Sequence, residues 1–205
     1  MCIRGSLTEA DIEDAYAFGY AVKLLGVAQR VGQDANAISI DVSPYLVPFT
    51  HPLATVHNEN NAVLVNGESV GEIMLYGPGA GELPTANSVL SDLTNIATDI
   101  ALNTPGRPFN SFNQNLDIAK PSQRLSRRFI VIEVDDTPGA MYSVTGMFAA
   151  AKISFSDLKQ TPAANGTARL VALTHPASDA QLNVIQTTIR NADGINLAAE
   201  YKIFS

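Results

Sequence analysis

The last third of the chain, residues 127–205, carries the pattern that most restricts the fold. Unbroken or alternating apolar residues predict four strands, at 128–134, 153–160, 168–174 and 195–203. Apolar residues at helical spacing predict one helix over 141–149 and a second that begins after Ser178 as its N-cap. Turn residues at Asp136–Gly139 and Asn165-Gly166 separate these elements. The predicted order is therefore strand, helix, strand, strand, helix, strand.

This order is typical of a ferredoxin-like βαββαβ unit, in which two helices pack on a four-stranded sheet. The sequence therefore predicts the α+β fold class, an α/β sandwich, for this part of the chain.

A glycine-rich stretch, Gly77-Pro78-Gly79-Ala80-Gly81, is the central feature of the first half. Before it, Ile73–Tyr76 is apolar without a break, which predicts a strand buried on both faces. After Pro84, apolar residues recur at helical spacing as far as Ile100. Two interpretations stay open: the glycines form a tight corner, or they expose main chain to an anion or a flat ligand.

The remaining elements of the first half are predicted from caps, alternation and turns. Residues 7–18 read as a short helix with Thr8 as N-cap, Asp11 as its capping-box partner and Gly19 at its end. Strands are expected at 20–31, 37–42, 62–65 and 70–76, with breaks at Pro44 and Pro48 and a hairpin turn at Asn66-Gly67. The first half, 1–103, is thus mostly β-sheet plus helix; a polar linker, 104–126, joins it to the domain at 127–205.

Composition excludes several classes of function. The net charge is −7 with no long basic run, so nucleic acid is not an expected partner. No apolar run has membrane-spanning length, and a single cysteine, Cys2, fits a reducing compartment, so we expect a cytoplasmic protein. His51, His57 and Glu59 lack the tight spacing of metal ligands, so no metal is expected.

Two single residues of the first half leave alternatives open. Lys23 is either an edge lysine or a perturbed acid/base group, and His51 is either a structural or a titrating histidine.

The βαββαβ order, with Asp136-x-Pro138-Gly139-Ala140-Met141 at the first strand–helix turn, resembles the ACT domain, a regulatory module that commonly binds amino acids. The resemblance implies an effector site framed by that turn and by the start of the second strand, at a contact between domains. The positions it implies are Asp136, Gly139, Ala140, Met141, Ile153 and Ser154. A turn that serves only packing and oligomerisation is the alternative.

The first half resembles the C-terminal part of the homoserine dehydrogenase catalytic region. The matching stretches, in the family's order, are 19–28, 51–54, 61–63, 77–81 and 84–86 with Asp92. A C-terminal ACT domain is a known arrangement of that family, whereas the N-terminal Rossmann domain and the catalytic lysine segment have no match here. The resemblance implies an NAD(P)-dependent enzyme that interconverts homoserine and aspartate semialdehyde in threonine and methionine biosynthesis.

The same resemblance places Gly77, Gly79, Ala80, Gly81 and Thr85 beside the dinucleotide, and it places no catalytic residue in these 205 residues. The chain alone is accordingly expected to be inactive and to bind no cofactor. A homo-oligomer, dimer or tetramer, is expected, with an amino acid such as threonine as effector. The alternative is a stand-alone amino-acid-binding or oligomerisation module.

Overall fold

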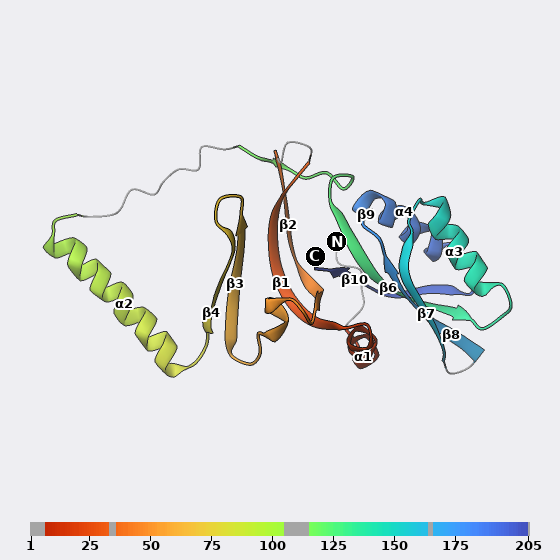
Figure 1. Cartoon of the computed structure of the whole chain (residues 1–205), viewed down its shortest axis with the longest axis horizontal. Helices are drawn as coiled ribbons and strands as arrows, with labels where there is room; N and C mark the ends of the chain where they lie inside the picture. Colours follow the sequence, from red (N-terminus) through yellow and green to blue (C-terminus); the bar gives the residue numbers. More distant parts are fainter. Residues whose placement is uncertain (1–6, 33–35, 105–114, 164–165, 205) are drawn as a thin grey trace. The chain divides into compact units, whose positions relative to one another are not determined.

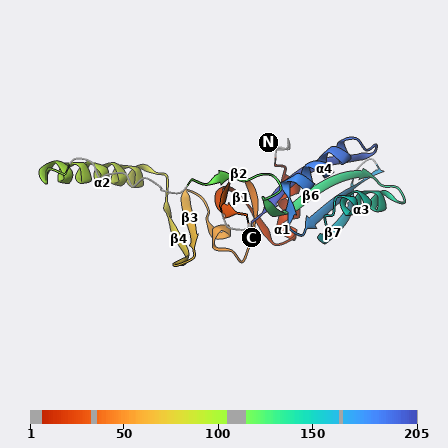
Figure 2. The same ribbon diagram turned by 90° about the horizontal axis from the view of Figure 1, so that it is seen from above.

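The computed structural model describes residues 7–32, 36–104, 115–163 and 166–204 (Figures 1 and 2). Cys2, Asn165 and residues 105–114 of the expected linker lie outside the described residues. The helices are α1 (Glu9–Ala17), η1 (Pro52–Thr55, a 3₁₀ turn), α2 (Glu82–Ala101), α3 (Ala140–Ala150) and α4 (Asp179–Arg190). The strands are β1 (Tyr20–Val31), β2 (Ala37–Pro48), β3 (Asn60–Gly67), β4 (Gly71–Pro78), β5 (Asp117–Ile118), β6 (Leu125–Asp135), β7 (Phe155–Pro162), β8 (Thr167–Thr174), β9 (Ala177–Ser178) and β10 (Ile195–Ile203). None of the described helices has the length and apolar character needed to cross a membrane.

The chain forms two compact units, and the second is inserted in the sequence of the first. The first unit combines Met1–Ala54 with Leu116–Ser205, and the second is Thr55–Asn115. Compactness therefore groups the N-terminal helix and strands with the C-terminal part of the chain. The division of the sequence into 1–103, 104–126 and 127–205 concerns family domains rather than compact units, and it stays a prediction.

The first unit is built on an eight-stranded sheet whose main path is β1-β2-β10-β6-β8-β7. The predicted βαββαβ order is present as β6, α3, β7, β8, α4 and β10. Its four strands lie side by side as β10-β6-β8-β7, and every adjacent pair is antiparallel. The α+β class is thus confirmed, with β1 and β2 extending the ferredoxin-like sheet beyond β10.

Strand β6 is buried on both faces because its side chains alternate between two cores. Ile130 and Ile132 pack with Phe148 of α3 and with residues of α4 in one cluster. Figure 1 shows α3 and α4 together on one face of this part of the sheet. Phe129 and Val131 face the opposite cluster, which α1 and the end of β2 cover.

Helix α1 is held on this second face by a buried charge cluster. The predicted capping box of Thr8 and Asp11 is confirmed, and Gly19 follows the helix with a φ of +84°. Asp11 is 3% exposed; its carboxylate accepts hydrogen bonds from the Tyr201 hydroxyl at 2.8 Å and from Nη2 of Arg169 at 2.5 Å. The Nε of Arg169 also pairs with Asp14 at 2.8 Å. Burial opposes ionisation of Asp11, but hydrogen bonds from Thr8, Tyr201 and Arg169 outweigh it and lower the pKa of the carboxyl.

The expected break at Pro44 is wrong, because β2 continues through this residue, whereas the strand does end at Pro48. Its full length pairs with β1, from Val31–Ala37 to Tyr20–Pro48. On its other edge β2 pairs only with β5 at residues 37–38 and with β10 at residues 45–46. Residues 39–44 have no strand partner on that edge within the described part of the chain, and edges of this kind tolerate proline.

The second unit consists of the β3–β4 hairpin and α2. The hairpin is confirmed, but Gly67 pairs with Gly71, so the turn lies at residues 68–70 rather than at Asn66-Gly67. The expectation that Ile73–Tyr76 is buried on both faces is wrong: β3 and β4 form a two-stranded sheet, and Leu75 is 66% exposed. Helix α2 has no buried residue, and its apolar stripe is exposed from Val89 to Ile100.

Candidate functional site

The glycine turn joins the end of β4 to the first residue of α2. Gly77 and Pro78 close the strand, and Gly81 is the N-cap of the helix with a φ of +117°, a conformation that residues with a Cβ rarely adopt. The space where a Cβ of Gly77 would project is open, with no atom of the described chain within 4 Å. The five residues predicted to approach the cofactor therefore lie within one short segment, from Gly77 to Thr85, and the four of them in the turn present largely bare main chain.

The position of Gly79 is also fixed by contacts with residues 59 and 61, which the sequence did not indicate. Its N–H donates to the carbonyl of Glu59 at 3.0 Å, which ties the turn to the start of β3. A Cβ at Gly79 would lie 1.4 Å from Nδ2 and 2.6 Å from Cγ of Asn61. The Asn61 side chain therefore lies directly over the Gly79 backbone. The stretch Asn61-Ala62-Val63 was part of the family resemblance, but nothing in its spacing indicated this contact.

The start of α2 is poorly suited to an anion. Pro84 lacks an N–H, and the N–H and hydroxyl of Thr85 both donate to the Gly81 carbonyl, at 3.2 and 2.7 Å. This leaves the N–H groups of Glu82 and Leu83 as free donors of the first turn, and the Glu82 carboxylate itself repels a phosphate. Of the two ligands considered for this turn, a flat ring against the bare main chain fits better than a phosphate at the helix end.

The six residues of the implied effector site fall into two groups in the single chain. Asp136, Gly139, Ala140 and Met141 lie at the start of α3, where Gly139 is a left-handed N-cap. Ile153 and Ser154 follow the end of the same helix, which is 11 residues or about 17 Å long. The residue of β7 that reaches Asp136 is Gln160, with Nε2 3.3 Å from its carboxylate, near the end of the strand. The two groups therefore lie at opposite ends of α3 and do not form one site within a single chain.

The other candidate residues occupy ordinary structural positions. Lys23 is half-buried in β1, opposite Tyr45 of β2. Nδ1 of His51 accepts the N–H of Leu53 at 3.2 Å, and its ring packs edge-on against Phe204 at 4.9 Å. The described residues contain no group of three or more histidine, cysteine, aspartate or glutamate side chains that converge on one point.

Comparisons with known proteins agree on one family. The family model described as "Homoserine dehydrogenase" matches residues 3–94. The homoserine dehydrogenase of Bacillus subtilis is 37% identical over 198 residues, covering 96% of this chain and 44% of that protein. The homoserine dehydrogenase of Lactococcus lactis is 30% identical, with 97% of this chain and 46% of that protein covered.

Solved structures give the same result for the fold. A homoserine dehydrogenase from Thiobacillus denitrificans superposes with a TM-score of 0.83 at 27% identity, over 97% of this chain and 46% of that one. A homoserine dehydrogenase of S. aureus superposes with a TM-score of 0.61 at 27% identity, over 95% of this chain and 44% of that one. The chain thus spans a little less than half the length of these relatives. It belongs to the homoserine dehydrogenase family.

Proposed function

We propose that this chain forms the C-terminal part of an NAD(P)-dependent homoserine dehydrogenase, which interconverts homoserine and aspartate semialdehyde in threonine and methionine biosynthesis. In this proposal the dinucleotide-binding domain and the proton-transferring residues come from the part of the family that the chain does not match. The chain contributes the Gly77–Gly81 turn as one wall of the cofactor site. A single cysteine suits a reducing compartment, so we propose a cytoplasmic location.

The observation that carries this proposal is the bare main chain of the turn. Open space beside Gly77 and the left-handed region at Gly81 allow a flat ring to approach the backbone. The nicotinamide ring is the flat part of the cofactor, and it would supply the hydride when bound. Glu82 and Pro84 make a phosphate unfavourable here, which supports the nicotinamide end rather than the pyrophosphate.

Complementation tests the proposal. The chain is co-expressed with the N-terminal half of the Bacillus subtilis homoserine dehydrogenase, the part that lies outside the match. NADPH oxidation with aspartate semialdehyde is then measured for each half and for the mixture. We expect no turnover from either half alone and measurable turnover from the complex, because hydride transfer needs the dinucleotide-binding domain and the glycine turn together.

Two controls make the result decisive. A copurification step shows whether the two halves associate, and the intact Bacillus subtilis enzyme fixes the assay's sensitivity. Turnover by the isolated chain would contradict the proposed division of labour. A stable complex without turnover would contradict the proposed role of the chain in this reaction.

The turn itself is tested by Gly79→Val in an active complex. We expect the KM for NADPH to rise about tenfold, equivalent to about 1.4 kcal/mol, because the added side chain displaces the Asn61 side chain and the displaced groups enter the space assigned to the ring. Asn61→Ala supplies the matched control, since the same Cβ would also meet the Asn61 side chain. If Asn61→Ala restores a normal KM to Gly79→Val, the defect is local packing and the turn does not contact the cofactor.

We further propose that residues 127–205 act as an ACT-type module within a homo-oligomer. Support comes from the complete βαββαβ order and from the positions of the implied effector residues at opposite ends of α3, which require a second chain to form one site. The exposed apolar stripe of α2 provides a further surface for association. An amino acid such as threonine is the proposed effector of that intermolecular site.

A further inference from the structure

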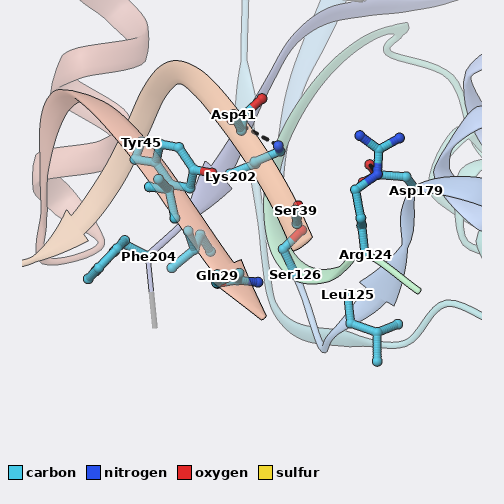
Figure 3. A pocket seen from close by; sticks show the side chains of 12 residues that line it. Gln29, Ser39, Asp41, Tyr45, Arg124, Leu125, Ser126, Asp179, Lys202 and Phe204 are labelled. Atoms are coloured by element: carbon cyan, nitrogen blue, oxygen red, sulfur yellow. Dashed lines mark ion pairs between the residues drawn. The ribbon is translucent and has the colours of Figure 1, made fainter. Parts of the chain in front are cut away.

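A hollow of about 130 Å³ opens in the first unit, beside the part of β2 (residues 39–44) whose outer edge pairs with no strand of the described chain (Figure 3). It lies where β2 leaves its pairing with β5 at Ile38 and before it meets β10 at Tyr45. Its polar lining includes Ser39, Asp41, Arg124, Ser126, Asp179 and Lys202. None of these residues belongs to the glycine turn or to the implied effector set.

One wall of the hollow is an ion pair between β2 and β10. The Nζ of Lys202 lies 2.9 Å from Oδ2 of Asp41 and 5.8 Å from the centre of the Tyr45 ring. The hydroxyl of Ser43 also donates to Asp41, at 2.5 Å. Burial opposes ionisation of Asp41, but the hydrogen bonds from Ser43 and Lys202 outweigh it and lower the pKa of the carboxyl. Asp41 is therefore a carboxylate at neutral pH.

The opposite wall is built around Asp179, the first residue of α4. The Nε of Arg124 lies 3.0 Å from its Oδ2, and Arg128 pairs with its Oδ1. Arg128 is 4% exposed and also lies 3.2 Å from Glu200, so it belongs to the buried support of the wall. The Arg124 side chain is 36% exposed, and it also lines the hollow.

The lining charges cancel, since Asp41 and Asp179 balance Lys202 and Arg124. A ligand with a net charge would leave one sign in excess, whereas a ligand that carries both signs finds partners for each. Carboxylates accept more than one hydrogen bond, and lysine and arginine offer several donors, so the existing ion pairs leave capacity for a ligand. A cavity of about 150 Å³ holds benzene, so this hollow suits a ligand of about six to eight heavy atoms.

We propose that this hollow is a binding site for a small α-amino acid in its zwitterionic form. The ligand's ammonium faces Asp41 and Asp179, and its carboxylate faces Lys202 and Arg124. Ser39 and Ser126 line the space between the two ion pairs and offer hydrogen bonds to a short polar side chain (Figure 3). The site needs neither the cofactor nor a second chain, and so it is independent of the proposed dehydrogenase activity.

Isothermal titration calorimetry on the 205-residue chain tests this proposal. L-Serine, L-threonine and L-homoserine are the probes, and three analogues are matched to them. Lactate lacks the ammonium, ethanolamine lacks the carboxylate, and glycine betaine carries both charges but has no N–H to donate. We expect saturable binding of at least one amino acid and affinities lower by about tenfold or more for all three analogues. Absence of binding by all three amino acids, or equal binding of an analogue, would overturn the proposal.

Two variants locate the binding. Asp41→Asn is expected to lower the affinity for the amino acid about tenfold or more. Asp136→Asn, the same change at the α3 turn, is expected to leave that affinity unchanged. Circular dichroism checks the fold of each variant, and Arg124→Gln, at a half-exposed position, replaces Asp41→Asn if that variant unfolds. Loss of binding in Asp136→Asn with retention in the hollow variants would assign the ligand to the turn and overturn the proposal.

Discussion

Replacement of Asp11 by alanine is expected to lower the free energy of unfolding by about 3 kcal/mol, because it removes one partner of a buried ion pair. Asp11 is 3% exposed, and its carboxylate accepts hydrogen bonds from Arg169 and from the Tyr201 hydroxyl. Without it, Tyr201 loses its acceptor in the interior, and Arg169 keeps only Asp14. Urea denaturation followed by far-ultraviolet circular dichroism measures the change. Glu13→Ala, an exposed acidic position on the same helix, is the control and should change stability by less than about 0.5 kcal/mol.

The stabilisation that the Asp11 carboxylate provides depends on pH, and the direction of this dependence follows from its lowered pKa. The pKa of Asp11 is lower in the folded chain than in the unfolded one, so its stabilisation is present above the ordinary aspartate pKa of about 4. That stabilisation is lost as the pH falls through the folded value, because the unfolded chain then binds the proton more readily. The difference between the wild type and Asp11→Asn should therefore be largest near neutrality and narrow below about pH 4. A difference that does not vary with pH would contradict an ionic role for Asp11.

Truncation of Phe148 to alanine is expected to destabilise the fold by about 3–5 kcal/mol, through lost burial and the cavity that remains. Phe148 has no exposed surface; it packs in the cluster of α3, α4 and β6, and its ring lies 4.8 Å from that of Phe155. The measurement is again the free energy of unfolding in urea.

Tyr142→Ala is the matched control for Phe148→Ala, since Tyr142 is an aromatic residue of the same helix that is 83% exposed. It should change stability by less than about 0.5 kcal/mol. A similar loss in both variants would show that helix propensity, rather than packing on the sheet, governs α3. An unchanged stability of Phe148→Ala would contradict the assignment of this face as a core.

Local signals predicted the elements whose ends are fixed by their own side chains. The predicted capping box of Thr8 with Asp11 starts α1, and the predicted N-cap Ser178 starts α4, where the structure adds Gln181 as its capping-box partner. Strands β1 and β10 were also predicted over their observed ranges, because the apolar pattern spans each of them. The βαββαβ order follows from such local patterns added together.

Burial and long-range placement could not be predicted in the same way. An apolar run such as Ile73–Tyr76 shows that a strand has apolar side chains, but it does not show whether another element of the chain covers them. The addition of β2 to the edge of β10 depends on pairing between Tyr45 and Lys202, which are far apart in sequence.

Of the two candidate sites, the one built from neighbouring residues could be predicted from the sequence, and the one built from distant residues could not. The glycine turn is contiguous, so its residues could be named from sequence, although the Asn61 contact could not. The hollow collects Asp41, Arg124, Asp179 and Lys202 from distant positions, and each alone resembles an ordinary surface charge. A sequence pattern gives no means of bringing these four together.

The attachment of β2 to β10 has a consequence for the integrity of the molecule. Strand β2, from the first part of the chain, and β10, from its end, are hydrogen-bonded neighbours. The N–H of Phe204 also donates a hydrogen bond to the carbonyl of Leu46. A protease that cuts the polypeptide between residues 104 and 116 would therefore produce two pieces that remain associated without any covalent link. Separating them would expose Phe129 and Val131 to water, so the nicked protein behaves as a noncovalent heterodimer of its own halves.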